Sequence, residues 1–142
     1  FSTGIERSAS DILSEQNQKS KEGNKDVIET LDHIKGIGQE TKDAFESGDL
    51  DRFGELLDVH WQIKKNLSNK ISNKFIDDCY KAAMSNGAMG GKIMGAGGGG
   101  FFMFYCSENQ KRLISAMKEK SLKPMKFRFD FEGAKILVNM KR

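Results

Sequence analysis

The sequence has little proline and cysteine, no long apolar run and no large excess of one charge. Its 142 residues include one proline and two cysteines, Cys79 and Cys106, which show neither a pairing motif nor metal-ligand spacing. This usage argues against a disulfide scaffold or a metal site and favours two free thiols in a reducing cytoplasm. A cytoplasmic protein with no metal ligands in this chain is therefore expected.

The lack of a long apolar run and of a strong charge excess limits the kinds of partner that this chain can bind. The longest apolar run, around residues 101–106, is far shorter than the ~18–20 residues of a membrane helix, and no signal peptide is visible. The formal net charge is only +3, with both signs spread along the chain, so there is no basic footprint for nucleic acid. No membrane or nucleic-acid partner is expected.

The sequence also lacks an initiator methionine, since it opens with FSTGIER. We therefore expect a piece of a longer protein. Its length suits one domain over residues 1–142, which would bury about 68–70% of its unfolded surface.

Helical periodicity dominates the first half. Thr3 and Glu6 fit a capping box that opens a first helix, which a polar stretch ends near Gly23. A second, longer helix is predicted through residues 27–45, and two glycines in its middle allow a kink.

Further helix signals follow. Ser47–Asp49 stops the second helix and caps a third, whose apolar stripe runs from Leu50 to Leu67. A fourth helix begins near Asn73 and stops at Asn86-Gly87. Ser107-Glu-Asn-Gln110 forms another capping box before a fifth helix.

The second half contains strand patterns. Lys92–Met94 predicts a short strand, and Phe101–Cys106 is apolar on both faces, as a central strand is. Residues 125–131 alternate strictly, as a half-buried strand does, and Glu132-Gly133 turns into AKILVNM to form a closing hairpin. The predicted fold class is α+β, a helical half packed on an antiparallel sheet of about four strands.

The stretch from Gly95 to Gly100 contains one residue that is not glycine and leads directly into the apolar strand. A flexible linker would precede polar residues, so a defined backbone shape is expected. The pattern G-x-G-x-x-G is satisfied, but a dinucleotide loop opens a helix, whereas a strand follows here. A Walker A loop fails because Asn86 and Ile93 replace required residues.

The glycine loop of protein kinases does lie between strands, but the H-R-D and D-F-G motifs are absent. Local features alone are equally compatible with a loop beside a ligand and with a hairpin loop that binds nothing.

The segment GAMGGKIMGAGGGGFFMFY, residues 87–105, resembles the third conserved motif of the GHMP kinases, which include galactokinase, homoserine kinase, mevalonate kinase and phosphomevalonate kinase. There a helix ends in GA, a GAK or GGK step follows, and GAGGGG leads into a hydrophobic strand. STGIERSASDIL and DRFGELLDVHWQIKKNLSNKISN resemble the sugar-phosphate kinases of the family, above all the D-glycero-D-manno-heptose 7-phosphate kinases. The resemblance covers essentially the whole chain, as the C-terminal half of such an enzyme.

This resemblance implies a ferredoxin-like C-terminal domain in a two-lobed kinase. In the family the N-terminal lobe carries the main ATP-phosphate loop at a helix N-terminus and, in several members, the catalytic base. This chain has no such loop, so no catalytic residue is assigned in it, and the chain alone is expected to be inactive. The implied cofactors are ATP and Mg²⁺, bound mainly by that lobe. The implied partners are the lobe itself and a small-molecule sugar phosphate.

In the family the third-motif loop faces the transferred phosphoryl group or the phosphate acceptor. Backbone without Cβ atoms lets amides approach phosphate oxygens closely and form a nest for anions. The expected phosphate contacts are Gly95, Ala96, Gly97, Gly98 and Gly99. Gly100 is expected to serve close packing where the strand starts.

Three side chains are further candidates for substrate or phosphate binding. Arg7, which matches the arginine of the subgroup's opening motif, could pair with a substrate phosphate, although a solvated or capping arginine explains it equally well. Lys92 could orient the loop, reach a phosphate or lie on the surface. His60 precedes Trp61, and a lone helical histidine more often packs or faces solvent than acts in catalysis.

Two functions are consistent with these expectations. The first is the acceptor-side half of an ATP-dependent kinase for a sugar phosphate such as a heptose 7-phosphate. The alternative is a stand-alone binding or interaction module that kept the fold without catalysis. A G-L-G-S-S-A-like loop within about 150–200 residues encoded upstream would support the kinase.

Overall fold

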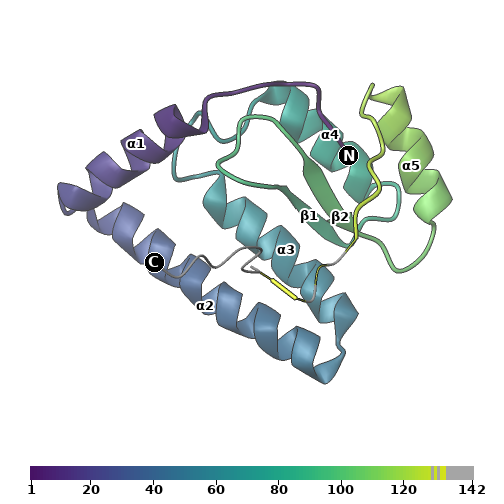
Figure 1. The fold of residues 1–142 in the computed structure, drawn as a ribbon, viewed down its shortest axis with the longest axis horizontal. Coiled ribbons are helices and arrows are strands. Elements are labelled where there is room, and N and C mark those ends of the chain that lie inside the picture. The colour runs from purple at the N-terminus through teal and green to yellow at the C-terminus, as the bar shows by residue number, and fades with distance from the viewer. Residues whose placement is uncertain (129, 131, 134–142) are drawn as a thin grey trace, which may run out of the picture.

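The computed structural model describes residues 1–128, 130, 132 and 133. Within them, helices surround a small antiparallel sheet (Figure 1). The helices are α1 (Ala9–Lys21), α2 (Lys25–Ser47), α3 (Leu50–Lys64), α4 (Lys74–Met84) and α5 (Gln110–Glu119), and the strands are β1 (Gly90–Ile93) and β2 (Phe102–Tyr105). The predicted α+β class is confirmed.

The sheet lies at the centre of the molecule, between the helices (Figure 1). Strands β1 and β2 pair with Gly90 opposite Tyr105 and Ile93 opposite Phe102. Ser2 forms single antiparallel bridges with Phe101 and with Lys123. The N-terminal segment therefore runs beside β2, and the segment at Lys123 runs beside the N-terminal segment, although β1 and β2 are the strands that the described residues form.

Helix α3 lies directly on the sheet because two glycines remove the side chains that would separate them. A Cβ atom on Gly90 of β1 would lie 1.9 Å from the carbonyl oxygen of Gly54 in α3. A Cβ atom on Gly54 would lie 2.5 Å from a ring carbon of Tyr105. The other side of α3 packs against α2, so α3 is the central helix of the domain.

An aromatic cluster joins α3 and α4 to β2. The ring of Trp61, which is fully buried, lies 6.2 Å from that of Tyr80 and 6.5 Å from that of Phe102, measured between ring centroids. Phe102 stacks on Phe104 at 4.9 Å. These contacts hold α3 and α4 against β2.

The predicted helix boundary at Ser47–Asp49 is confirmed. Gly48 adopts a left-handed conformation with φ 75°, and the Asp49 side chain accepts a hydrogen bond from the Arg52 amide. The second helix continues unbroken through Gly36 and Gly38 as α2, which has 23 residues.

Both predicted capping boxes are wrong. The Thr3 hydroxyl donates to the Gly100 carbonyl at 2.9 Å, and α1 begins only at Ala9. The Ser107 hydroxyl donates to the sulfur of Met89, and α5 has Asn109 as its N-cap, with no side-chain cap. In each case a distant residue takes the hydroxyl that the local pattern assigned to a helix end.

The strand predicted over residues 125–131 is not formed in its described part. Residues 125–128 have no strand assignment, and Met125 and Phe127 are 54% and 68% exposed. An alternating pattern becomes a strand only where a neighbour pairs with its backbone, and the last bridge recorded here is at Lys123. Residues 129 and 131 and the second strand of the predicted hairpin lie outside the described residues.

Candidate functional site

The glycine loop, residues 94–101, joins β1 to β2 and has a defined shape. The Met94 amide donates to the Phe101 carbonyl at 2.8 Å and closes its base. Four of its glycines have φ values between 75° and 114°, a region that other residues rarely adopt; they are Gly95, Gly97, Gly98 and Gly100. The loop is therefore a fixed structure rather than a flexible tether.

The inner part of this loop, Gly97–Gly99, is buried against two other segments. The Gly98 amide donates to the Ile71 carbonyl at 2.7 Å. A Cβ atom on Gly97 would lie 2.8 Å from the Ile71 side chain, and one on Gly99 would lie 2.7 Å from the Ile5 carbonyl oxygen. These glycines permit close packing, and Gly98 already uses its amide to anchor the loop.

The outer part of the loop, Gly95 and Ala96, is accessible. Gly95 is exposed, and a Cβ atom there would meet nothing within 4 Å. Within the described residues, the amides of Gly95, Ala96, Gly97 and Gly99 donate no hydrogen bond. Free amides on a backbone of this shape suit an anion. The Gly100 amide, by contrast, donates to the Ile5 carbonyl, in keeping with a packing role.

Basic side chains gather beside the outer part of the loop. The Lys64 ammonium donates to the Gly95 carbonyl. Lys92 on β1 places its Nζ 3.0 Å from Nδ1 of His60, which lies one turn before Lys64 on α3. We refer to His60, Lys64 and Lys92 as the basic cluster. Sequence reasoning found two of its members and missed Lys64, although the i, i+4 spacing from His60 was a usable signal.

Arg7 lies next to the inner part of the loop. A Cβ atom on Gly98 would lie 3.4 Å from Arg7 Cδ, and the Arg7 residue is exposed. The structure therefore brings all three predicted side chains, Arg7, His60 and Lys92, to the surroundings of the glycine loop.

Burial and mutual repulsion disfavour the charged forms of the side chains in the basic cluster. Burial, and then the charges of Lys92 and Lys64, lower the pKa of His60 to about 4. Burial and then the Lys64 charge lower the pKa of Lys92 to about 8, and burial lowers the pKa of Lys64. At pH 7 the imidazole is therefore neutral and accepts from the Lys92 ammonium, which can only donate.

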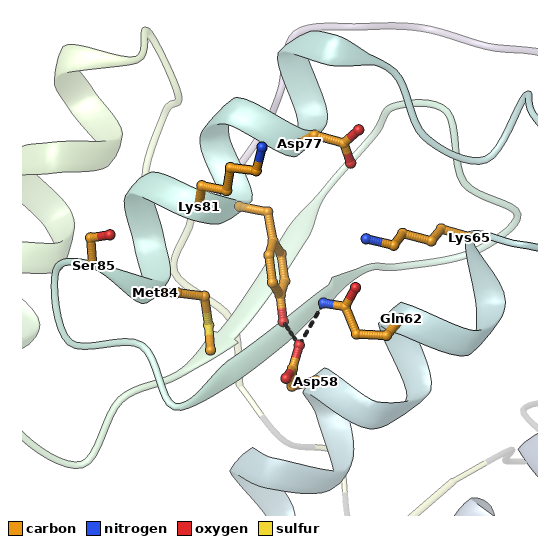
Figure 2. A pocket seen from close by; sticks show the side chains of 8 residues that line it. Asp58, Gln62, Lys65, Asp77, Lys81, Met84 and Ser85 are labelled. Atoms are coloured by element: carbon orange, nitrogen blue, oxygen red, sulfur yellow. Dashed lines mark hydrogen bonds between the residues drawn. The ribbon is translucent and has the colours of Figure 1, made fainter.

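A second candidate site is a hollow of about 500 Å³ between α3 and α4, shown in Figure 2. Asp58 lies at its floor and accepts hydrogen bonds from the Tyr80 hydroxyl at 2.6 Å and from the Gln62 amide at 2.8 Å. Lys65 and Asp77 also line the hollow, so its charges are mixed. Because its central carboxylate is already paired, this hollow is explained by structure alone.

No group of three or more His, Cys, Asp or Glu side chains among the described residues could hold a metal ion. None of the helices described is long and apolar enough to span a membrane.

Comparisons with known proteins point to one family. The family model described as "GHMP kinases C terminal" matches residues 41–122. The D-glycero-alpha-D-manno-heptose 7-phosphate kinase of Campylobacter jejuni is 35% identical over 136 residues, which cover 95% of this chain and 40% of that protein. The galactokinase of Pyrococcus furiosus is 37% identical over 76 residues, which cover 53% of this chain and 21% of that protein.

The fold has a close match among solved structures. The crystal structure of L. major mevalonate kinase in complex with R-mevalonate superposes with a TM-score of 0.76 at 20% identity, over 84% of this chain and 36% of that one. The chain thus spans less than half the length of each of these relatives.

Proposed function

This chain belongs to the GHMP kinase family, and from that premise we propose that it forms the acceptor-side half of an ATP-dependent small-molecule kinase. Its acceptor is a sugar phosphate, such as the heptose 7-phosphate named for its Campylobacter jejuni relative. An N-terminal lobe of the same protein completes the active site. The chain alone supplies the fold and the glycine loop but no catalytic base.

One observation carries this proposal: the free amides of the outer glycine loop lie beside basic side chains that have no acidic partner among the described residues. Phosphoryl transfer requires positioning and stabilisation of charge more than covalent help from the protein. Backbone donors already held in place stabilise developing charge without reorganisation. In this proposal the accessible amides of Gly95 and Ala96 face the phosphoryl group during transfer.

Arg7 has a supporting role in the proposal. Its side chain passes Gly98 on the inner side of the loop, whereas Lys64 contacts Gly95 on the outer side. A guanidinium can pair with a phosphate through two parallel hydrogen bonds. Arg7 therefore orients a phosphate oxygen from the opposite side of the loop.

The cofactors are divided between the two halves. The described residues offer donors that fit a phosphate group, but no cluster of acidic ligands that fits Mg²⁺. The proposal therefore assigns Mg²⁺ and most ATP contacts to the N-terminal lobe. ATP supplies the phosphoryl group, and this chain binds and orients the acceptor and excludes water from it.

The test uses two glycines that are matched in the structure. Gly95 and Gly48 have φ values of 81° and 75°, and a Cβ atom at either would meet nothing within 4 Å. Valine at each site imposes a similar backbone strain. In the complete enzyme, Gly95→Val should lower kcat by about 10²- to 10³-fold, the usual effect of losing one oxyanion donor, while Gly48→Val should lower only the melting temperature.

ADP release with a sugar phosphate as acceptor measures this turnover, and thermal unfolding measures stability. Equal kcat values for the two variants would show that the loop is only a hairpin and would contradict the proposal. The 142-residue chain alone is the second control and should show no turnover. Saturable turnover by it would mean that the catalytic groups lie in this half.

A further inference from the structure

We propose that the basic cluster binds a phosphate group that the acceptor already carries, so that the enzyme selects phosphorylated sugars over free ones. This inference rests on the proposed kinase function and deepens it, because it names the substrate group recognised and the residues that recognise it. His60 and Lys64 come from α3 and Lys92 from β1, beside the outer glycine loop.

The cluster has cations but no counterion. The ion pairs of the described residues use other basic side chains, namely Lys19, Lys42, Arg52, Lys70 and Lys74. Neither Lys64 nor Lys92 has an acidic partner in that part of the chain. Half-burying two ammonium groups side by side costs stability. Groups kept at such a cost are typical of functional sites, where a ligand relieves the repulsion.

The chemistry of the cluster fits a phosphate monoester. Two lysine charges match a dianion, and ammonium groups bind phosphate as point charges with several donors each. His60 is neutral at pH 7 because its pKa is about 4, so it can accept from the Lys92 ammonium, which lies 3.0 Å from Nδ1 and 3.4 Å from Nε2, and thereby orients Lys92. A single carboxylate would leave one of the two positive charges unbalanced.

The cluster adjoins the outer part of the glycine loop. Lys64 donates to the carbonyl of Gly95, one of the two accessible loop residues whose amides are free within the described residues. In this proposal the cluster holds one end of an acceptor whose other end reaches these amides. A sugar with a phosphate at one end and a reactive hydroxyl at the other fits this arrangement.

The first experiment compares substrates in the complete enzyme. Lys92→Met and Lys64→Met should each raise the KM for a sugar phosphate by about 10- to 100-fold, the effect of losing a hydrogen bond to a charged group. The KM for ATP and the value of kcat should change much less. Wild type should prefer the phosphorylated sugar over the same sugar without phosphate, and both variants should lose that preference.

The second experiment uses inorganic phosphate as the probe. At constant ionic strength, phosphate should raise the Tm of wild type more than chloride does, and both variants should lose this shift. The unliganded variants should be at least as stable as wild type, because they remove the repulsion. Lys111→Met, at an exposed position on α5, is the control and should keep the shift.

Three outcomes would overturn the inference. In the first, the variants raise the KM for ATP alone, which assigns the cluster to nucleotide phosphates. In the second, wild type uses phosphorylated and free sugar equally well. In the third, phosphate still raises the Tm of both variants. An enzyme that transfers no phosphoryl group to any sugar would instead refute the proposed function. The shift in Tm would then still decide whether the cluster binds phosphate.

Discussion

The two flanks of α3 are organised in opposite ways. On the flank toward α4, Asp58 accepts from both Tyr80 and Gln62 (Figure 2). On the other flank, His60 contacts Lys92 and Lys64 contacts the Gly95 carbonyl, with no carboxylate among the described residues to balance the two lysines. Residues two positions apart, such as 58 and 60, point about 200° apart on a helix, so one helix separates a satisfied network from an unsatisfied one.

This difference separates structural from functional polar groups. Burial and the hydrogen bond to Asp58 raise the pKa of Tyr80, so the phenol stays a protonated donor and helps to hold α4 against α3. The basic cluster has one internal hydrogen bond, between Lys92 and His60, but brings together two ammonium groups without a carboxylate among the described residues. The fold alone accounts for the paired carboxylate, and we propose a ligand for the cluster.

The largest predicted loss of stability comes from a change that pushes α3 away from the sheet. Both flanks of α3 depend on this contact. Gly90→Ala would place a Cβ atom 1.9 Å from the Gly54 carbonyl oxygen, and backbone cannot move aside cheaply. The free energy of unfolding should fall by about 3 kcal/mol or more. Denaturant unfolding measures it, and Gly38→Ala, with open space around it, should instead stabilise α2 by about 0.5–1 kcal/mol. Similar stability of the two variants would contradict direct contact between α3 and β1.

An intermediate effect is expected from breaking the satisfied flank. Asp58→Ala leaves the Tyr80 hydroxyl without its acceptor and should lower stability by about 1–3 kcal/mol. The Tm shift caused by phosphate should be unchanged, because the other flank is intact. In a double-mutant cycle with Tyr80→Phe, the two losses should be strongly non-additive. Additive losses would mean that this hydrogen bond contributes little.

The smallest predicted effect is the loss of stability at acidic pH. The pKa of His60 falls from 6.5 to about 4 on folding, so the unfolded chain takes up this proton first as the pH decreases. Stability should therefore decrease between about pH 6.5 and pH 4 and level off below that. His60→Gln should remove this part of the pH dependence, which solvent screening keeps modest.

Urea unfolding across that pH range measures the difference between wild type and His60→Gln, and an NMR titration of the ring gives the pKa directly. Added phosphate should raise that pKa, because an anion favours the imidazolium. A His60 pKa near 6.5 without phosphate would show that neither burial nor the neighbouring lysines lower it.

Much of the fold was predictable from local patterns. The stop and cap at Gly48 and Asp49 and the helix start near Asn73 agree with the structure, and the apolar strand predicted over Phe101–Cys106 is found as Phe102–Tyr105. The resemblance to the GHMP kinases is confirmed by the family match. These features depend on residues close together in the chain, where backbone conformation and short-range hydrogen bonds decide the result.

The errors arose where distant residues compete for the same groups. Thr3 gives its hydroxyl to Gly100 rather than to a helix end, and the alternating residues 125–128 lack the pairing that would make them a strand. The sequence also could not predict which loop glycines are buried and which are accessible. No local pattern shows that the Gly98 amide donates to the Ile71 carbonyl while the Gly95 amide donates no hydrogen bond within the described residues.

The sequence by itself determined the helices of the first half, the need for left-handed backbone in the loop and the family. Side-chain spacing and the missing Cβ atoms carry that information directly. Only the tertiary structure decided which glycines pack and which face outward, and which lysines meet His60. These outcomes depend on α3 lying against β1 through Gly54 and Gly90, a contact between segments more than thirty residues apart.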